Sequence, residues 1–347
     1  MRAVREPVDV LLVSLGSTPG WRAADTELAD SMRRSGASVA VITAEVQTPV
    51  RTFMLTDLGW ARAARAAARD ALNRYVPGAT IYSTTTAALL WPAPGAIRFD
   101  ALAAENRPGR HGLWQRPVER RRLAESPLLL PMSEGALGAS ATGFQRRRAL
   151  VLPMPVEPSG STEGKRDIAA ATYAGNPAKK GTARVVEAWR NARRDAEELV
   201  VAGCTREQLA RAGVSLAPEE PGIRLVGALP PDQYRALLRR ARVFVCAPRR
   251  EDYGIAQLEA LADGCMLVTM PAPGPYPALA LARELDSRLV GEDLASALRS
   301  ALDAPRGDYG ARATRAISPF TREAADRVVA RELLPRLLAD APAYASS

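Results

Sequence analysis

Segments typical of short apolar strands alternate with segments typical of helices along almost the whole chain. Val8–Ser14 is the first expected strand, and Ala23–Ser35, ended by Gly36, is the first expected helix. A helix that joins two strands returns the chain to the starting edge of the sheet, so this rhythm favours parallel sheets. The sequence therefore predicts an α/β fold. The other elements expected in this half are strands at Ser38–Thr43, Ala79–Ser83, Ala96–Phe99, Leu128–Pro131 and Ala149–Leu152, a helix at Leu58–Tyr75 and a short helix from Glu134.

A stretch rich in Pro, Gly and Ser, Pro153–Lys165, interrupts the rhythm near the middle of the chain. The 347 residues are also too many for one ordinary core. We expect one domain over residues 1–155, a linker over 156–166, a second domain over 167–319, and a C-terminal helix with its tail over 320–347. The second half repeats the alternation, with strands expected at Ala170–Ala174, Glu198–Ala202, Ile223–Val226, from Val243 and at Cys265–Met270, and helices at Thr182–Arg194, Arg206–Ala212, Asp232–Ala241, Asp293–Asp303 and Thr321–Ala339.

The charge is unevenly divided between the two halves. The whole chain carries +9, and residues 1–155 contribute 20 basic against 13 acidic side chains. A basic first half favours a polar or anionic substrate or surface. The sequence lacks any aromatic-interleaved basic stretch or known nucleic-acid motif, so we do not expect a nucleic-acid partner. Arginines at positions 62, 65 and 69 share one helix face, which favours a solvated face over the alternative, a peripheral contact with anionic lipid.

Several features favour a cytoplasmic protein. The three cysteines, Cys204, Cys246 and Cys265, have no metal-binding spacing, and two of them fall in expected buried strands. No run of about 18 apolar residues is present. We interpret Val8–Ser14 as a strand and not as part of a signal peptide, because acidic residues interrupt the apolar run.

Two glutamates, Glu251 and Glu259, are the most informative residues for function. The first stands in a loop after an apolar strand that begins at Val243, and the second lies within the helix that follows, before Gly264. Open α/β sheets bind ligands at the edge where strands end and helices begin. A carboxylate at that edge can accept two hydrogen bonds from a vicinal diol, such as the hydroxyls of a ribose. Two glutamates at this spacing alone would more often be solvated surface residues.

A second motif lies before the two glutamates in the sequence. It consists of a strand, a loop with Gly175, the pair Lys179 and Lys180, and a helix beginning at Thr182. Free amides at a helix N-terminus together with ammonium groups form a site for a diphosphate. The lysine precedes a glycine, and the glycine expected before it is missing, so this is not the nucleotide-triphosphate loop. The chain has only three lysines, at positions 165, 179 and 180, so an adjacent pair of lysines is unusual in this Arg-rich sequence.

With Tyr253-Gly254 after the first glutamate and Ala-x-Ala-x-Gly around the second, this segment resembles the E-x7-E signature of retaining glycosyltransferases of the GT-B fold, family 4, or glycosyl transferases group 1. The resemblance implies two Rossmann-like domains that face a central cleft, with a C-terminal helix crossing back to the first. It implies that Glu259 binds the ribose diol, that the amides of Tyr253, Gly254 and Ile255 approach the diphosphate and sugar, and that Glu251 contacts the donor sugar or orients the reacting end.

The resemblance extends to the rest of the donor site. Lys180 and its loop correspond to the donor-diphosphate loop, although Asn176 stands where family members usually have arginine, so that Lys179 is expected to substitute. Backbone near Gly227 is expected to read the base edge; a plain strand and turn is the alternative. The sequence contains no Asp-x-Asp motif, so lysine and helix amides are expected to replace a metal. We therefore expect no cofactor and no metal.

The first domain carries weaker signals for the acceptor. Gly16 and Ser17 follow the first strand, where the family often has a Gly-rich acceptor-side loop, and a simple turn is the alternative. Asp100 ends an expected strand, where family members often carry a catalytic His or Asp. It is the first candidate for positioning or deprotonating the acceptor hydroxyl, and His111, the chain's only histidine, is the second.

The resemblance thus predicts transfer of a sugar, with retention, from a nucleoside-diphosphate sugar to an acceptor hydroxyl. A nucleotide-sugar hydrolase or epimerase of the same fold is one alternative. A degenerate, transferase-like binding or scaffold subunit is another, favoured by Asn176 and by the absence of the usual histidine. An NAD-type oxidoreductase is disfavoured, because the glycine fingerprint of dinucleotide-binding folds is absent.

Overall fold

The computed structural model describes residues 5–46, 52–138, 141–161 and 164–339. These residues form two compact units, each built on one parallel sheet of five strands. Unit 1 runs to Pro155 and takes up the chain again from Arg322, and unit 2 spans Val156–Thr321. Residues 162 and 163 of the expected linker lie outside the described part. None of the helices in the described part is long and apolar enough to cross a membrane.

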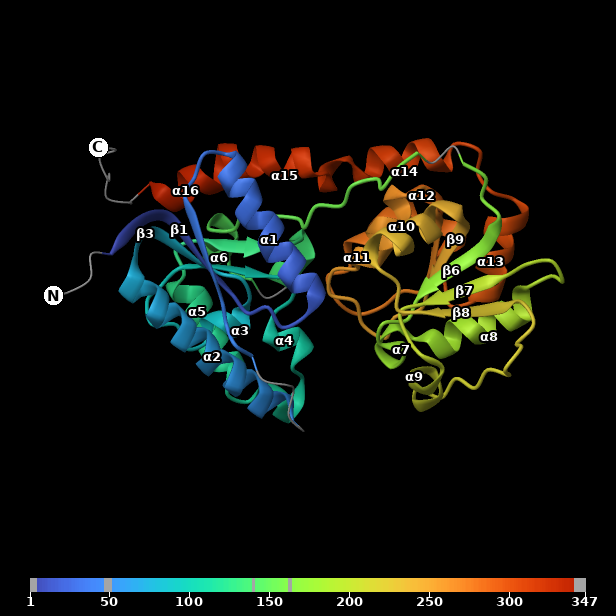
Figure 1. Ribbon diagram of the computed structural model, residues 1–347, viewed down its shortest axis with the longest axis horizontal. Helices are drawn as coiled ribbons and strands as arrows, with labels where there is room; N and C mark the ends of the chain where they lie inside the picture. The colour runs from blue at the N-terminus through green and yellow to red at the C-terminus, as the bar shows by residue number, and fades with distance from the viewer. Residues whose placement is uncertain (1–4, 47–51, 139–140, 162–163, 340–347) are drawn as a thin grey trace. The chain divides into compact units, whose positions relative to one another are not determined.

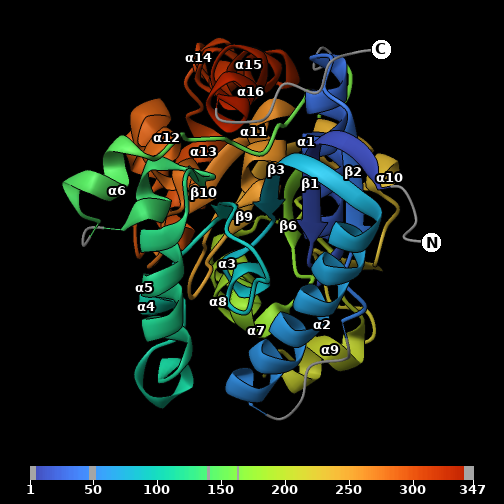
Figure 2. The same ribbon diagram turned by 90° about the vertical axis from the view of Figure 1, so that its left-hand side faces the viewer.

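The sheet of unit 1 has the strand order β2-β1-β3-β4-β5, and its strands β1 and β3 are labelled in Figure 1. Helices cover both of its faces, as the alternation of strands and helices requires (Figure 2). Its strands are β1 (Glu6–Ser14), β2 (Val39–Thr43), β3 (Tyr75–Tyr82), β4 (Ala96–Phe99) and β5 (Leu129–Pro131). The helices between them are α1 (Pro19–Arg34), α2 (Phe53–Arg74), α3 (Thr85–Ala88), α4 (Ala103–Asn106), α5 (Gln115–Glu125) and α6 (Gly143–Arg147), with 3-10 turns at Gly109–Gly112 and Glu134–Leu137.

Two apolar clusters hold the helices of unit 1 on its sheet. On one face, alanines of α2, including Ala64, Ala68 and Ala71, pack with Leu11 and Phe99 of the strands. An alanine stripe lets a long helix approach a sheet closely, while Arg62, Arg69 and Asp70 of α2 remain exposed. On the other face, α1 packs with Val10, Leu12 and Ile81, the next residues along β1 and β3.

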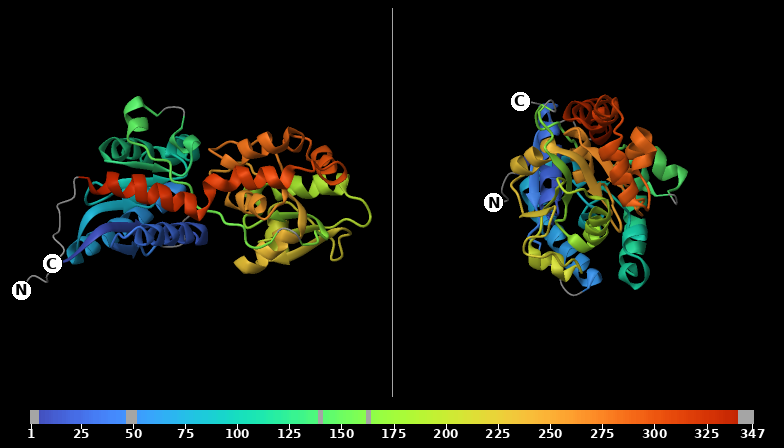
Figure 3. Two further views of the ribbon diagram at one scale, coloured as in Figure 1. Left: turned by 90° about the horizontal axis from the view of Figure 1, so that it is seen from above. Right: turned by 90° about the vertical axis from the view of Figure 1, so that its right-hand side faces the viewer.

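The last helical segment of the described chain also belongs to unit 1. It consists of α15 (Arg322–Val328), a π-helical turn (Val329–Leu333) and α16 (Leu334–Leu338), and lies over the first sheet (Figure 3). Asp326 accepts hydrogen bonds from Ser31 and Arg34 of α1, at 2.5 and 2.8–2.9 Å. The π-helical turn precedes Pro335, whose ring lacks an N–H and disfavours regular α-helical spacing before it.

The expected strand Ala149–Leu152 is wrong. This segment runs beside β5 and makes a single isolated bridge, between Leu129 and Ala149. Leu150 and Leu152 donate backbone hydrogen bonds to Leu129 and Pro131 of β5. Pro131 has no N–H to return such a bond, so a regular ladder does not form.

Unit 2 has the strand order β10-β9-β6-β7-β8. Its first strand is therefore the central one, and the sheet grows outward in both directions from it, with helices on both faces (Figure 3). The strands are β6 (Ile168–Tyr173), β7 (Leu199–Ala202), β8 (Ile223–Gly227), β9 (Ala241–Cys246) and β10 (Met266–Thr269). The helices are α7 (Pro177–Lys180), α8 (Thr182–Ala192), α9 (Arg206–Arg211), α10 (Pro231–Arg240), α11 (Ile255–Ala262), α12 (Pro277–Asp286), α13 (Leu294–Asp303) and α14 (Tyr309–Ile317), with 3-10 turns at Ser287–Leu289 and Ser318–Phe320.

Candidate functional site

The order of the strands identifies one edge of unit 2 as the place for a ligand. After β6 the chain builds β7 and β8 on one side, and then returns to build β9 and β10 on the other. The loops that leave the carboxyl ends of β6 and β9 therefore diverge in opposite directions. Ligands of open α/β sheets bind in the crevice at such a switch point. The expected lysine loop follows β6, and the loop with Glu251 follows β9 (Figure 1).

The lysine loop is fixed closely against the loop after β9. Asn176 caps α7 by accepting a hydrogen bond from the backbone N–H of Lys179, at 3.0 Å. Gly181, which joins α7 to α8, has a left-handed backbone with φ +65°, and a Cβ added there would lie 1.8 Å from the carbonyl oxygen of Ala247. Arg249 donates a backbone hydrogen bond to the carbonyl of Lys179, at 3.0 Å. Only glycine allows this approach of the two loops.

An ion pair joins the two loops. The Nζ of Lys180 lies 2.5 Å from the Oε2 of Glu251. The Glu251 carboxylate is buried, with 5% of the residue exposed, and also accepts a hydrogen bond from Gln257 at 3.3 Å. The loop after β10 is bonded to this segment, because the backbone N–H of Glu251 donates to the carbonyl of Pro273 at 3.0 Å. Lys180 and Glu251, predicted separately from two motifs, thus meet at the switch point.

The loop after Glu251 turns sharply into α11. Tyr253 is buried, and Gly254 has a left-handed backbone with φ +84° immediately before the first helical residue, Ile255. A side chain at Gly254 would collide with the ring of Tyr276, 2.8 Å from the added Cβ. The first N–H groups of a helix have no partner within the helix and attract anions. The expected diphosphate amides are therefore those of a helix start at the same edge as Lys180.

Glu259 lies one helical turn further on, on α11. Its side chain is 25% exposed, and Oε1 stands 3.7 Å from the Nη1 of Arg235 on α10. Burial raises the pKa of Glu259 to about 7; Arg235 opposes this rise, and Asp263 adds to it. Asp263 is fully buried and accepts a 2.6 Å hydrogen bond from Arg235. Arg235 therefore links Glu259 to a fixed carboxylate behind it.

The edge beside β7 and β8 is lined by glycines and tyrosines. Gly203 and Gly227 both have left-handed backbones, and a 2.6 Å hydrogen bond joins the N–H of Gly203 to the carbonyl of Gly227. A Cβ added to Gly227 would meet no atom within 4 Å, so space is open beside it. The rings of Tyr173 and Tyr234 pack with centroids 5.4 Å apart.

In unit 1 the corresponding switch point lies between β1 and β3. Gly16 and Ser17 follow β1 there. Gly16 has φ +59° and is buried against Thr43, and its carbonyl accepts a 2.7 Å hydrogen bond from Arg22. Ser17 is half-buried. These contacts make the loop a tight turn into α1, and an acceptor role for it stays a prediction.

Asp100 and His111 lie at different places in unit 1. Asp100 directly follows β4 and is half-buried, one strand removed from the switch point. His111 is exposed, in the 3-10 turn that precedes α5. Their assignment as catalytic residues stays a prediction. Among the residues that the structure describes, no group of His, Cys, Asp and Glu is arranged to hold a metal ion.

Comparisons with known proteins agree with this geometry. Residues 168–304 match the sequence model of the family described as Glycosyl transferases group 1. Among solved structures, WaaG, a glycosyltransferase involved in lipopolysaccharide biosynthesis, matches with a TM-score of 0.64 and 14% identity, over 93% of this chain and 100% of that one. Sucrose-phosphate synthase from Thermosynechococcus elongatus matches with a TM-score of 0.66 and 14% identity, over 96% and 100%. The chain has the GT-B fold.

Anabaena HepE in complex with UDP and glucose is a third structure similar to this GT-B chain, with a TM-score of 0.63 and 13% identity, over 94% of this chain and 99% of that one. No curated protein matched by sequence. The matched residues 168–304 contain both donor-side motifs, so the glycosyltransferase resemblance found from them is confirmed for this part of the GT-B chain. Retention of configuration and independence from metal stay predictions.

Three residues that support the two glutamates of this GT-B chain are not predicted from the sequence. Gln257 donates to Glu251, and Arg235 and Asp263 fix the surroundings of Glu259. Gln257 lies two residues before Glu259, and Asp263 lies four after it, at helical spacing. That spacing places Asp263 near Glu259, but Arg235 comes from another helix and has no local signal.

Proposed function

We propose that the chain transfers a sugar, with retention, from a nucleoside-diphosphate sugar to an acceptor hydroxyl, without a divalent metal. The observation that carries this proposal is the meeting of Lys180 with Glu251 at the switch point of unit 2, with Glu259 on the helix that starts there. Such an edge binds a nucleotide, and the carboxylates and ammonium group supply the contacts that a nucleoside-diphosphate sugar needs.

The diphosphate would lie against a surface with surplus positive charge. The two loops carry Lys179, Lys180, Arg249 and Arg250 against Glu251 and Asp252, a net charge of +2. Lys180 is already held at the edge by Glu251, and the start of α11 adds amide donors. Preorganised donors stabilise the charge that develops on a leaving diphosphate. This supports metal-free chemistry.

Glu259 would accept hydrogen bonds from the ribose diol. Its carboxylate is partly exposed, while Arg235 and Asp263 hold its surroundings from behind. Two hydrogen bonds to a charged group would each contribute roughly 1.5–3 kcal/mol to binding. Because the pKa of Glu259 is raised to about 7, donor binding should weaken as the pH falls below that value and the carboxylate is protonated.

The donor is tested by thermal-shift titration with UDP, GDP, ADP and dTDP and their common sugars, with and without EDTA. We expect one nucleoside diphosphate to stabilise the wild type regardless of EDTA, and Glu259→Ala to abolish this shift. Glu187→Ala, which removes an exposed glutamate from α8, is the matched control and should keep it. An unchanged donor affinity in Glu259→Ala would contradict the ribose assignment. A donor shift that requires added Mg²⁺ would contradict metal independence.

On the acceptor side, we assign Asp100 the role of positioning or deprotonating the acceptor hydroxyl, with His111 as the second candidate and Gly16 and Ser17 beside the acceptor. The position of Asp100 at the carboxyl end of β4 supports this order, and the exposed turn of His111 fits it less well. Loss of a general base lowers turnover by roughly 10²–10⁴-fold. Asp100→Asn should therefore lower kcat and leave donor affinity unchanged. An unchanged kcat would show that Asp100 does not act on the acceptor hydroxyl.

Product analysis separates transfer from the related activities. Incubation of the donor with acceptor sugars should give a glycoside whose anomeric configuration, read by NMR, equals that of the donor. Hydrolysis without any acceptor product would indicate a nucleotide-sugar hydrolase. Failure of every nucleoside diphosphate to bind would favour a scaffold subunit. The +7 charge of residues 1–155 makes polar and anionic sugars the first acceptors to test, in a cytoplasmic setting.

A further inference from the structure

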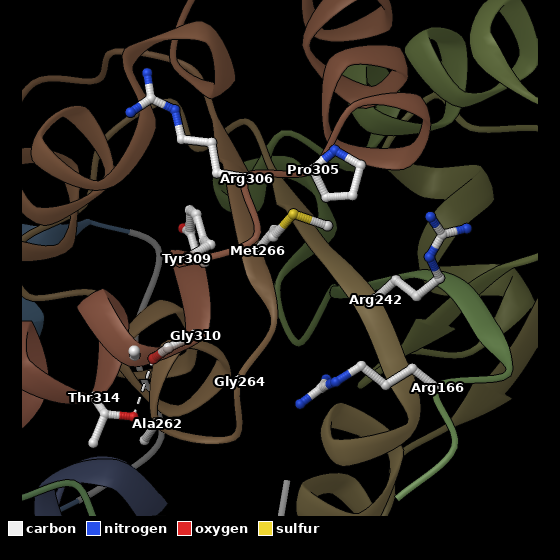
Figure 4. Close-up of a pocket in the computed structure, with 11 residues that line it drawn as sticks. Arg166, Arg242, Ala262, Gly264, Met266, Pro305, Arg306, Tyr309, Gly310 and Thr314 are labelled. Carbon is white, nitrogen blue, oxygen red and sulfur yellow. Dashed lines mark hydrogen bonds between the residues drawn. The ribbon is translucent and has the colours of Figure 1, made fainter. Parts of the chain in front are cut away.

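A second pocket lies in unit 2, at the amino-terminal ends of the strands and thus at the opposite edge from the lysine loop. Its cavity volume is about 560 Å³. Arg166 precedes β6, Arg242 is the second residue of β9, and Met266 begins β10. Tyr309 and Gly310 of α14 form the facing wall (Figure 4). Small-molecule sites usually have volumes of roughly 300–1,000 Å³, so this space suits a metabolite.

The charge of this pocket is positive. Its described lining includes three arginines and no carboxylate. Figure 4 shows Arg166 reaching inward, while Arg306 points away from the other two arginines. Arg306 also lies 3.3 Å from Asp286, which offsets its charge. Arg166 and Arg242, which come from the same wall, therefore supply most of the field inside the pocket.

Both of these arginines are held in place by the backbone. Arg166 donates to the carbonyl oxygens of Ala241 and Asp263, at 2.6 and 2.7 Å, and Arg242 donates to that of Leu302, at 2.6 Å. A guanidinium group has five N–H donors, so these neutral acceptors leave donors and the full charge for an anion. The forked geometry of a fixed guanidinium matches phosphate oxygens well.

We propose that this pocket binds a phosphorylated small molecule at a site separate from the one that holds the donor. The pocket and the donor edge share α11, which begins at Ile255 and ends at Ala262, a lining residue. Eight helical residues span roughly 12 Å, so one ligand at each end can be bound at the same time. Asp263, whose carbonyl holds Arg166, also binds Arg235, the partner of Glu259.

Gly310 offers a way to close the pocket without touching an arginine. It lines the pocket, and a Cβ added there meets no atom within 4 Å, so a methionine fits at this position and should reduce the space in the cavity. Gly307 is also free of neighbours but does not line the pocket, so Gly307→Met is the matched control. Circular dichroism and thermal unfolding would show that both variants keep the fold.

The probes are inorganic phosphate, fructose 1,6-bisphosphate and citrate, titrated by calorimetry into the full chain. We expect the sugar bisphosphate to bind at one site, with affinity at least tenfold lower in Gly310→Met and unchanged in Gly307→Met. Arg242→Met should weaken binding roughly tenfold to a hundredfold, the loss expected for hydrogen bonds from a charged donor. Inorganic phosphate should bind the same site more weakly.

Lys180→Met separates this site from the donor edge. Binding that survives in Lys180→Met and is lost in Gly310→Met supports the proposal. Binding that is lost in Lys180→Met and kept in Gly310→Met places the probe at the lysine loop and overturns it. The absence of binding by both phosphate probes at millimolar concentration also overturns it. Tighter binding of citrate than of the sugar bisphosphate overturns the assignment to phosphate. None of these outcomes depends on transferase activity.

Discussion

Units 1 and 2 each contain a five-stranded parallel sheet with helices on both faces, but different side chains lie at their switch points. In unit 2, oppositely charged side chains of two loops, Lys180 and Glu251, meet there. In unit 1, polar groups near the switch point form hydrogen bonds with other groups of the same unit. The N–H of Leu15 donates to the hydroxyl of Ser83 at 3.1 Å, and Ser14 donates to the buried Asp25 at 2.5 Å.

The comparison shows that, in the same architecture, polar groups at the sheet edge can pair with one another or can remain in loops where a charged ligand could bind. Asp25 lies 3.4 Å from the fully buried Arg98 of β4, and desolvation raises the pKa of Asp25 although this arginine opposes the rise. These groups stabilise one another inside unit 1. The charges of unit 2 instead stand in loops with a surplus of basic residues. Among the described residues, the switch point of unit 2 therefore suits the predicted diphosphate better than that of unit 1 does.

The largest effect on folding is expected at the glycine that brings the two loops of unit 2 together. Gly181→Ala should lower the free energy of unfolding by about 2–4 kcal/mol, because the added Cβ would lie 1.8 Å from the carbonyl oxygen of Ala247 and φ is +65°. Urea unfolding measures the change. The control in unit 1 is Gly36→Ala, where φ is +91° but no atom lies within 4 Å, and about 1–2 kcal/mol is expected. Equal losses would show that the contact between the loops adds nothing.

The next effect concerns the charge at the switch point of unit 2. Lys180→Met should lower the affinity for the nucleoside diphosphate found by thermal shift roughly tenfold to a hundredfold. Lys179→Met should have a smaller effect, because this side chain is half-exposed and stands 3.9 Å from Asp252. Calorimetric titration measures both, and affinity for the free nucleoside should not change in either variant.

Lys180→Met also leaves the buried Glu251 without its cation, which by itself destabilises the loop. The double variant Lys180→Met/Glu251→Gln removes both charges and separates the two effects. If it restored full diphosphate affinity, then Lys180 would serve only to neutralise Glu251. The charges at the switch point of unit 2 would then only pair with each other, as those of unit 1 do.

Features that depend on residues close together in the sequence could be predicted, whereas contacts between distant residues could not. The strand Ala96–Phe99 was placed correctly because its apolar run is local. Helix α12 was not predicted, because it begins at Pro277 after a stretch dense in Pro and Gly that resembles a loop. Lys180 and Glu251 were each found from a local motif, but their contact depends on the return of the chain across β6.

Side chains of unit 1 show the same limit. Arg98 and Asp25 are 73 residues apart, and each by itself looks like an ordinary charged residue within an apolar run or a helix. Their burial is determined by the packing of α1 on the sheet, where Arg98 donates to the carbonyl of Ala24, and no spacing in the sequence encodes this contact. The acceptor candidates were weaker than the donor candidates for this reason.

The last comparison is between two glutamates, one in each unit, whose pKa is raised by burial to about 7 in both cases. Glu119 of unit 1 is 4% exposed, and its Oε1 accepts a 2.8 Å hydrogen bond from the N–H of Ala103. Its Oε2 and the Oε1 of Gln115, four residues earlier on α5, are buried without a hydrogen-bond partner in the structure. Two acceptors on the same helix face would be satisfied by a proton on Glu119.

Glu119→Gln should therefore raise the free energy of unfolding by about 3 kcal/mol at pH 8 and by less than about 1 kcal/mol at pH 5. The folded pKa lies above the unfolded one, near 4.5, so the folded state holds the proton more tightly. The cost of the wild-type carboxylate then grows between pH 4.5 and about 7 and is complete above that range. Urea unfolding across this range measures the difference between the two proteins.

The matched variant, Glu259→Gln, makes the comparison between the units direct. It should weaken donor binding at pH 8, because the ribose diol loses a charged acceptor, whereas Glu119→Gln should leave donor binding unchanged. A donor affinity that fell equally in both variants would mean that the buried glutamate of unit 1 also acts on the donor. A pH-independent gain in Glu119→Gln would mean that relief of the two buried acceptors, and not the proton, determines its stability.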